Sequence, residues 1–137
     1  MKQIIGTLAV VIIVGIAGMM VFKSSEKRFN ARITKFHEDA ATVIQGLQQY
    51  KEFVGSYPNG PANADIVKAL QGKTDKKVLI LSVQKTALNE KGEMVDPWGT
   101  PLMFYFSGNA VIVRSAGPNK AWEDTSVMAS DDLFRSN

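Results

Sequence analysis

Residues 29–54 read FNARITKFHEDAATVIQGLQQYKEFV, and this stretch decides the fold. Its apolar side chains recur every three or four positions, which is the periodicity of an amphipathic helix. These positions are Phe29, Ile33, Phe36, Ala40, Ile44, Leu47, Tyr50 and Val54. The next residues, Gly55-Ser-Tyr-Pro58, suit a helix end, because glycine takes the left-handed cap and proline cannot continue a helix. We therefore expect a long helix with one stripe packed on a small soluble domain.

Upstream, residues 4–22 read IIGTLAVVIIVGIAGMMVF, a run of 19 residues without a charge. As a helix the run rises about 28 Å, close to the hydrocarbon thickness of a bilayer of about 30 Å. It exceeds the apolar region of a secretory signal, so we expect a transmembrane anchor at residues 1–24 and a soluble domain at 25–137. We assign to the membrane and assembly helix Ile4, Leu8, Val11, Gly15, Gly18, Phe22, Phe29, Ile33 and Phe36.

Composition excludes several classes of function. The 137 residues include no cysteine and one histidine, His37, which we expect to be a solvated helix residue. Thiol chemistry, clustered histidine sites and the common hydrolase and nucleotide motifs are absent, so we expect no enzyme and no small-molecule substrate. Residues 1–92 hold 13 Lys/Arg against 7 Asp/Glu, while residues 93–137 hold 3 against 6. No recognition motif accompanies the basic part, so nucleic acid is not an expected partner.

The middle of the chain predicts an α+β fold. Residues 63–70 have the pattern of a short helix, and residues 77–83 that of an apolar strand or an extended segment. Two strand-like runs, 102–106 and 110–114, flank Ser107-Gly108-Asn109 and predict an antiparallel hairpin. Two segments that contain proline and glycine, one after the long helix and one before the hairpin, predict turns. The residues to which we assign structural roles in these turns are Tyr57, Pro58, Asp96, Pro97, Trp98, Gly99 and Pro101.

Residues 115–132 form an acidic loop that is too rich in glycine, proline and serine for a helix or a strand. Four acids and Asn119 lie between residues 119 and 132, where neighbouring carboxylates repel one another. Calcium takes six to eight oxygen ligands in flexible geometry and would remove that repulsion. A solvated acidic loop followed by a frayed C-terminus is the alternative interpretation.

Four motifs in order resemble the major pseudopilin of type II secretion systems and its pilin-like relatives. They are Tyr57-Pro58, Asp96-Pro-Trp-Gly-Thr-Pro101, Ser115-Ala-Gly-Pro-Asn119 and Asp131-Asp132. The resemblance implies a long helix packed in the core of a filament, a small sheet outside it, and a calcium ion that ties down the C-terminal loop. It implies side-chain ligands at Asn119, Asp124, Asp131 and Asp132, with backbone carbonyls near Arg114 and Pro118. The family usually has aspartate where this chain has Asn119.

The N-terminus departs from the family pattern of a cleavable leader, a Gly-Phe junction and a glutamate five residues into the mature chain. Here Thr7 follows Gly6, and Val11 stands at the glutamate position. We therefore expect a pseudopilin-like structural subunit, anchored in lipid and assembling with like subunits through its long helix. The alternative function is a single-pass protein that presents a calcium-stabilised binding domain without forming filaments.

The membrane orientation has two opposing indications. The resemblance implies a single-pass protein of the inner membrane, with the C-terminal domain on the periplasmic or extracytoplasmic side. The basic residues Lys23, Lys27, Arg28 and Arg32 follow the apolar run, whereas Lys2 alone precedes it. The positive-inside rule taken by itself favours a cytoplasmic C-terminal domain.

Overall fold

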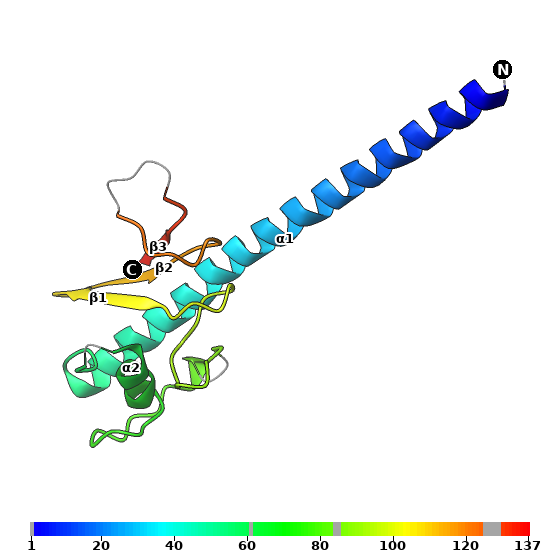
Figure 1. Ribbon diagram of the computed structural model, residues 1–137. Coiled ribbons are helices and arrows are strands. Elements are labelled where there is room, and N and C mark those ends of the chain that lie inside the picture. The colour runs from blue at the N-terminus through cyan, green and yellow to red at the C-terminus, as the bar shows by residue number, and fades with distance from the viewer. Residues whose placement is uncertain (1, 61, 84–85, 125–129) are drawn as a thin grey trace. The chain divides into compact units, whose positions relative to one another are not determined.

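The computed structural model describes residues 2–60, 62–83, 86–124 and 130–137, with residues 2–12 described by their backbone alone (Figure 1). The elements are helices α1 (Lys2–Val54) and α2 (Asn63–Leu70), the 3-10 helix η1 (Leu81–Val83), and strands β1 (Met103–Ser107), β2 (Ala110–Ser115) and β3 (Leu133–Ser136). The expected α+β class is confirmed, with a long N-terminal helix packed on a small antiparallel sheet. The chain forms two compact units, one ending at Arg32 and the other beginning at Ile33.

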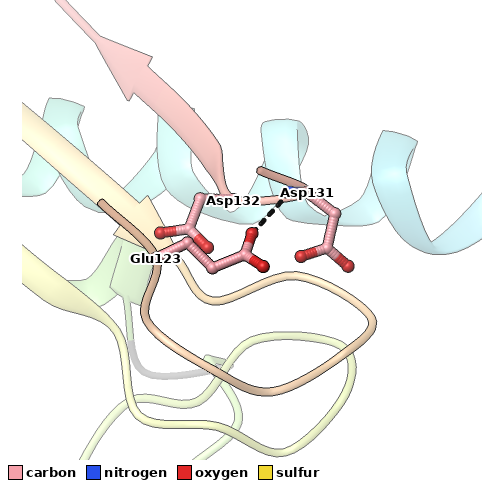
Figure 2. Close-up of side chains that lie close together, drawn as sticks. All are labelled: Glu123, Asp131 and Asp132. Atoms are coloured by element: carbon pink, nitrogen blue, oxygen red, sulfur yellow. Dashed lines mark hydrogen bonds between the residues drawn. The ribbon is translucent and has the colours of Figure 1, made fainter. Parts of the chain in front are cut away.

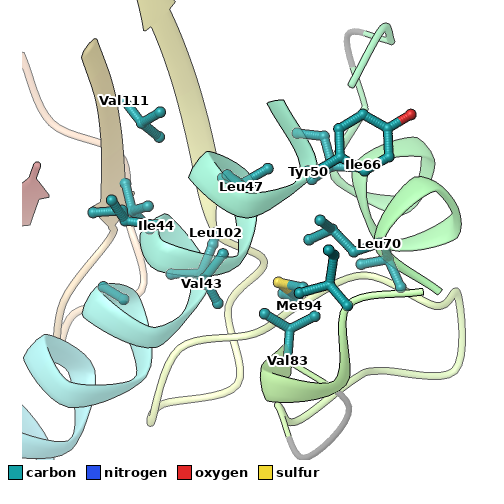
Figure 3. Close-up of a cluster of buried hydrophobic side chains, with 14 of the residues drawn as sticks. Val43, Ile44, Leu47, Tyr50, Ile66, Leu70, Val83, Met94, Leu102 and Val111 are labelled. Carbon is teal, nitrogen blue, oxygen red and sulfur yellow. The ribbon is translucent and has the colours of Figure 1, made fainter. Parts of the chain in front are cut away.

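The core of the second unit forms around one stripe of α1 (Figure 3). The stripe begins at Phe36 and ends at Tyr50, and its apolar residues are buried. They pack against α2, the segment that leads to η1, the segment before β1 and the inner face of the sheet. The largest fully buried partners there are Leu70, Met94, Val111 and Val113. The three-to-four-residue spacing in the sequence thus corresponds to burial from Phe36 onward.

Gly46 lies where α1 passes closest to the η1 segment. A β-carbon at this position would come within 2.7 Å of Val83 Cγ1 and 3.1 Å of Ile80 Cγ2. Because both neighbours are branched at Cβ, they have little rotamer freedom to move aside. The glycine therefore sets the distance between α1 and this segment.

The sheet is antiparallel throughout, in the order β1-β2-β3. Alternation places Val111, Val113 and Ser115 inward and leaves Ile112 exposed. The hairpin matches the sequence prediction with a shift of one residue, since β1 is Met103–Ser107 and β2 extends to Ser115.

One strand was not predicted, and of the two alternatives for residues 77–83 the strand was wrong. Strand β3 was not expected, because four residues at the end of an acidic loop carry too little pattern to predict a strand. The segment 77–83 is not a strand. It makes an isolated bridge between Gln71 and Leu79 and then forms η1.

The first unit contains the N-terminal part of α1. Its described large apolar side chains are exposed, including Ile13, Ile16, Met19 and Phe22 at 50–72% of their maximum. Within the residues that the structure describes, no helix combines the length and the apolar character needed to cross a bilayer. The expected span begins at residue 4, and the side chains of Ile4, Leu8 and Val11 lie outside the described residues.

Candidate metal-binding loop

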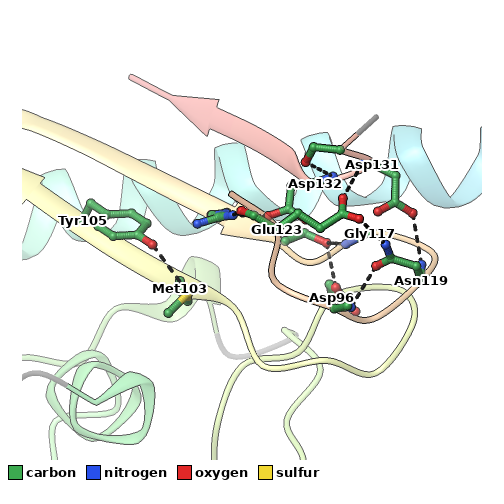
Figure 4. Close-up of polar contacts among 12 residues, drawn as sticks. Asp96, Met103, Tyr105, Gly117, Asn119, Glu123, Asp131 and Asp132 are labelled. Atoms are coloured by element: carbon green, nitrogen blue, oxygen red, sulfur yellow. Dashed lines mark hydrogen bonds and ion pairs between the residues drawn. The ribbon is translucent and has the colours of Figure 1, made fainter. Parts of the chain in front are cut away.

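The start of the loop after β2 is tied to Asp96, a buried carboxylate in the turn before β1. Its Oδ1 accepts hydrogen bonds from the backbone N–H groups of Trp98 (3.0 Å) and Thr100 (2.9 Å). Its Oδ2 accepts the Ser115 hydroxyl at 2.6 Å, and Ser115 Oγ in turn accepts the Gly117 N–H at 3.0 Å. Asp96 thus fixes its own turn and joins it to the beginning of the loop (Figure 4).

Gly117 is the point where the two ends of the loop cross. Its φ of +70° lies in the left-handed region, and a β-carbon there would overlap the backbone carbonyl of Asp131. Glycine is therefore required twice, for its backbone conformation and for the space that the returning chain occupies.

Side-chain hydrogen bonds then close the loop on itself. The Asn119 N–H donates to Asp131 Oδ2 at 3.1 Å, and Asn119 Nδ2 donates to Glu123 Oε1 at 3.0 Å. The Asp131 N–H donates to Glu123 Oε2 at 2.9 Å. This last bond is the main reason that the pKa of Glu123 lies below its ordinary value. Glu123 is thus an acceptor for both ends of the loop in its ionised form.

Arg114, in β2, supplies the positive charge beneath the loop. Its Nε donates to Asp132 Oδ2 at 2.6 Å, Nη2 pairs with the same oxygen, and Nη2 also donates to the carbonyl of Glu123. The rings of Trp122 and Phe134 each lie 5.3 Å from the guanidinium carbon, within the range of a cation–π contact. The pKa of Arg114 is raised, first by the Tyr105 side chain and, against the cost of burial, by Asp132.

Three carboxylates converge at the closure. Glu123, Asp131 and Asp132 each place one oxygen within 4.8 Å of the other two (Figure 2). Asp131 Oδ1 and Asp132 Oδ1 are buried and have no hydrogen-bond partner among the described residues. A buried carboxylate oxygen without a donor is costly, and an all-oxygen donor set suits a hard cation such as calcium. These residues therefore fit a metal ion, although Arg114 already neutralises part of the charge.

The cluster differs in part from the set that the resemblance implied. Asp131 and Asp132 belong to it, but Asp124 is exposed and its neighbour Glu123 occupies the cluster. The side-chain oxygen of Asn119 accepts the Ala121 N–H at 2.8 Å, so this residue shapes the loop. Residue type alone did not separate two adjacent acids, because which one points inward depends on the path of the loop.

Backbone carbonyls near Arg114 and Pro118 were expected as further ligands. The backbone of Arg114 is paired with Met103 and Phe134 in the sheet, and its contacts to the loop are made by its guanidinium group. Pro118 is half-buried beside Gly117. The guanidinium role was missed in the sequence. The available signal was alternation, because Arg114 lies between the inward-facing Val113 and Ser115 and must therefore leave the strand on its outer face.

The remaining turn residues support the hairpin and the core. The Tyr57 hydroxyl donates to the carbonyl of Asn109 at 2.8 Å, and its ring lies 5.0 Å from that of Phe106. Pro58 and Trp98 are buried, and Gly99 adopts a φ of +89°.

Comparison of the chain with protein-family models, curated proteins and solved structures returns no match.

Proposed function

We propose that this chain is a membrane-anchored, pseudopilin-like structural subunit that assembles through the N-terminal half of α1. The observation that carries the proposal is the unequal burial along this helix. From Phe36 to Tyr50 its apolar stripe is buried in the core of the second unit. From Ile13 to Phe22 its large apolar side chains are exposed.

An exposed apolar stretch of this size needs a cover that is lipid or protein. No charge interrupts the sequence between Lys2 and Lys23. A β-carbon at Gly15 or Gly18 would meet nothing within 4 Å, so this part of the helix leaves room for other helices to approach. Lipid around residues 4–22, with like subunits beside it, is the cover that we propose. We place the second unit on the extracytoplasmic side of the inner membrane.

In this proposal the C-terminal loop is a structural calcium site. Glu123, Asp131 and Asp132 would hold the ion, and the ion would neutralise the carboxylates that remain after Arg114 has paired with Asp132. Its effect would be to fix the crossing of the loop at Gly117. No step of catalysis is part of the proposed function.

Membrane insertion is tested by carbonate extraction of membranes from cells that express the full chain. We expect the chain to remain in the pellet. Ile16→Lys places a charge in the apolar run, at a cost of about 3 kcal/mol at a bilayer centre, and should release the chain. Leu81→Lys is the matched control, because Leu81 is 74% exposed in the second unit. Extraction of the unaltered chain by carbonate would contradict the anchor.

The calcium site is tested by thermal melting of the full chain in a mild detergent, with calcium or with a chelator. A ligand that binds only the folded state stabilises it by about 2.7 kcal/mol at a hundredfold excess over Kd. We expect calcium to raise Tm, and Asp131→Asn to abolish that rise. Asp75→Asn, at an exposed acid outside the loop, should leave it intact. An unchanged Tm in millimolar calcium would remove the ion from the proposal.

A further inference from the structure

Among the strands that the structure describes, none covers the edge of β1 that faces away from β2. The register of β1 with β2 pairs Ser107 with Ala110 across a two-residue loop, and hydrogen-bonded pairs alternate from there. Ser107, Tyr105 and Met103 therefore direct their backbone groups toward β2. The backbone groups of Phe104 and Phe106 are directed away from the sheet, because successive residues of a strand alternate in this respect.

The same edge is already covered one step upstream. The Leu102 N–H donates to the Met94 carbonyl at 2.9 Å, and Val95 forms an antiparallel bridge with Pro101. The Leu102 carbonyl accepts Asn63 Nδ2 at 2.8 Å, and the Asn63 side chain also bonds both backbone groups of Met94. A short ladder thus begins on this edge at residues 94–95 and stops before Phe104.

The uncovered part lacks the features by which proteins protect a sheet edge. Met103–Ser107 contains no charge and no proline, and runs for about 17 Å. The opposite edge is different, since β3 has four residues and includes the exposed Arg135. Among the described backbone groups, none donates to or accepts from those of Phe104 and Phe106. Such an edge is a template for another strand.

A groove of about 520 Å³ runs along this edge. One wall is residues 101–106, and the other includes Gly60, Asn63 and Ile66 from the segment at α2, with Trp122 also lining the groove. Among the described lining residues, Glu93 alone carries a charge. Its Oε2 accepts the Asn89 side chain, and no lysine or arginine of the described chain forms an ion pair with it.

We propose that this groove binds an extended peptide segment of a partner protein, which adds to β1 as a strand. The peptide pairs with the backbone of Phe104 and Phe106, places alternate apolar side chains against the groove walls, and carries one lysine or arginine opposite Glu93. A second copy of this chain fits less well. Its own β1 brings the wall of Gly60, Asn63 and Ile66 with it, and two such walls would compete for one groove. This inference is independent of the proposed function.

The test uses the full chain in a mild non-ionic detergent. The probe is a short acetylated and amidated peptide that alternates valine with threonine and contains one arginine. Titration followed by ¹⁵N NMR should show saturable shifts at residues 103–106, and hydrogen exchange at the Phe104 and Phe106 amides should slow. Replacement of the arginine by glutamine, or Glu93→Gln in the chain, should weaken binding about threefold, and the two changes together should cost no more than either alone.

A matched pair of variants tests the proposed hydrogen bond between the Phe104 backbone N–H and the peptide. Phe104→Ala keeps the outward N–H, whereas Phe104→Pro removes it without taking a bond from the β1–β2 ladder. We expect the proline variant to bind about fivefold more weakly than the alanine variant. A peptide N-methylated at alternate residues tests the same bonds in the unaltered chain, and should bind only in one of its two registers of methylation.

Three results would overturn the proposal. The first is no saturable binding by the unmethylated peptide at millimolar concentration. The second is equal binding by the proline and alanine variants and by both methylated peptides. The third is a concentration-dependent dimer, detected by sedimentation, that protects the same two amides without any peptide, because a second copy would then be the occupant.

Discussion

Two regions of the second unit are held together in different ways. Beneath α1, the fully buried side chains are mainly apolar, among them Phe36, Leu47 and Leu70. In the loop after β2, the contacts that fix the chain are carboxylates, amides and one guanidinium group. Apolar packing tolerates neighbours of similar volume, whereas each polar contact in the loop needs one specific partner. The two regions should therefore respond to substitution in different ways.

The largest effect is expected in the apolar core. Leu47 is 0% exposed at the centre of the α1 stripe. Leu47→Ala should lower the free energy of unfolding by about 3 kcal/mol, because it removes buried apolar surface and leaves a cavity. Leu81→Ala, at a leucine that is 74% exposed, should cost less than about 0.5 kcal/mol. Chemical denaturation measures both, and equal losses would contradict the assignment of the core.

Removal of the internal cation should have an effect almost as large. Arg114→Met keeps much of the side-chain length but leaves Asp132, whose side chain is 0% exposed, without its counter-charge. We expect a loss of about 3 kcal/mol. The double variant with Asp132→Asn should recover part of it, as a double-mutant cycle will show. If the loss is the same in the double variant, the ion pair does not hold the loop.

The effect of calcium on the stability of Arg114→Met gives a further prediction. If Glu123, Asp131 and Asp132 hold the ion, calcium should stabilise Arg114→Met more than it stabilises the unaltered chain, since more negative charge is left for it to neutralise. Magnesium, which demands a stricter geometry, should have a smaller effect. A difference in Tm between calcium and chelator that is no larger in the variant would contradict this role.

Alanine substitution of two glycines in the polar turns distinguishes the stability cost of backbone strain from that of steric overlap. Gly117 and Gly99 both have a positive φ, of +70° and +89°. An alanine at either position costs about 1 kcal/mol for the left-handed conformation. At Gly117 the methyl group would also overlap the Asp131 backbone, while at Gly99 it would meet nothing within 4 Å. We expect Gly117→Ala to cost about 2 kcal/mol more than Gly99→Ala in denaturant unfolding. Similar losses would show that the loop crossing is not tight.

The smallest effect is expected inside α1. Gly46→Leu gains helix propensity but forces its side chain against Val83 and Ile80, for a net loss of about 1 kcal/mol. Gly18→Leu is the control in the same helix, because a β-carbon there meets nothing within 4 Å. It should leave the unfolding of the second unit unchanged. A stabilised Gly46→Leu would mean that η1 moves aside freely.

The contrast between the apolar core and the polar loop also explains how well each region was predicted from the sequence. The α1 stripe, the α2 helix and the β1–β2 hairpin were predicted because periodicity and turn residues are local signals. The roles of Glu123 and Arg114 depend on a loop that returns to its start, and β3 depends on pairing across the intervening acidic loop. These roles and this strand cannot be predicted from the spacing of neighbouring residues. Asn63 was expected only at a helix start, yet its side chain joins Met94 to Leu102.

Assembly of the N-terminal half of α1 with like subunits is the central element of the proposed function. The chain has no cysteine, so a single introduced cysteine is a clean probe. Met19→Cys and Leu81→Cys compare two side chains of similar exposure, 72% and 74%, one in each unit. Oxidative cross-linking in intact membranes should give dimers from Met19→Cys and none from Leu81→Cys. A Met19→Cys chain that remains monomeric under conditions that oxidise its thiol would contradict assembly through this helix.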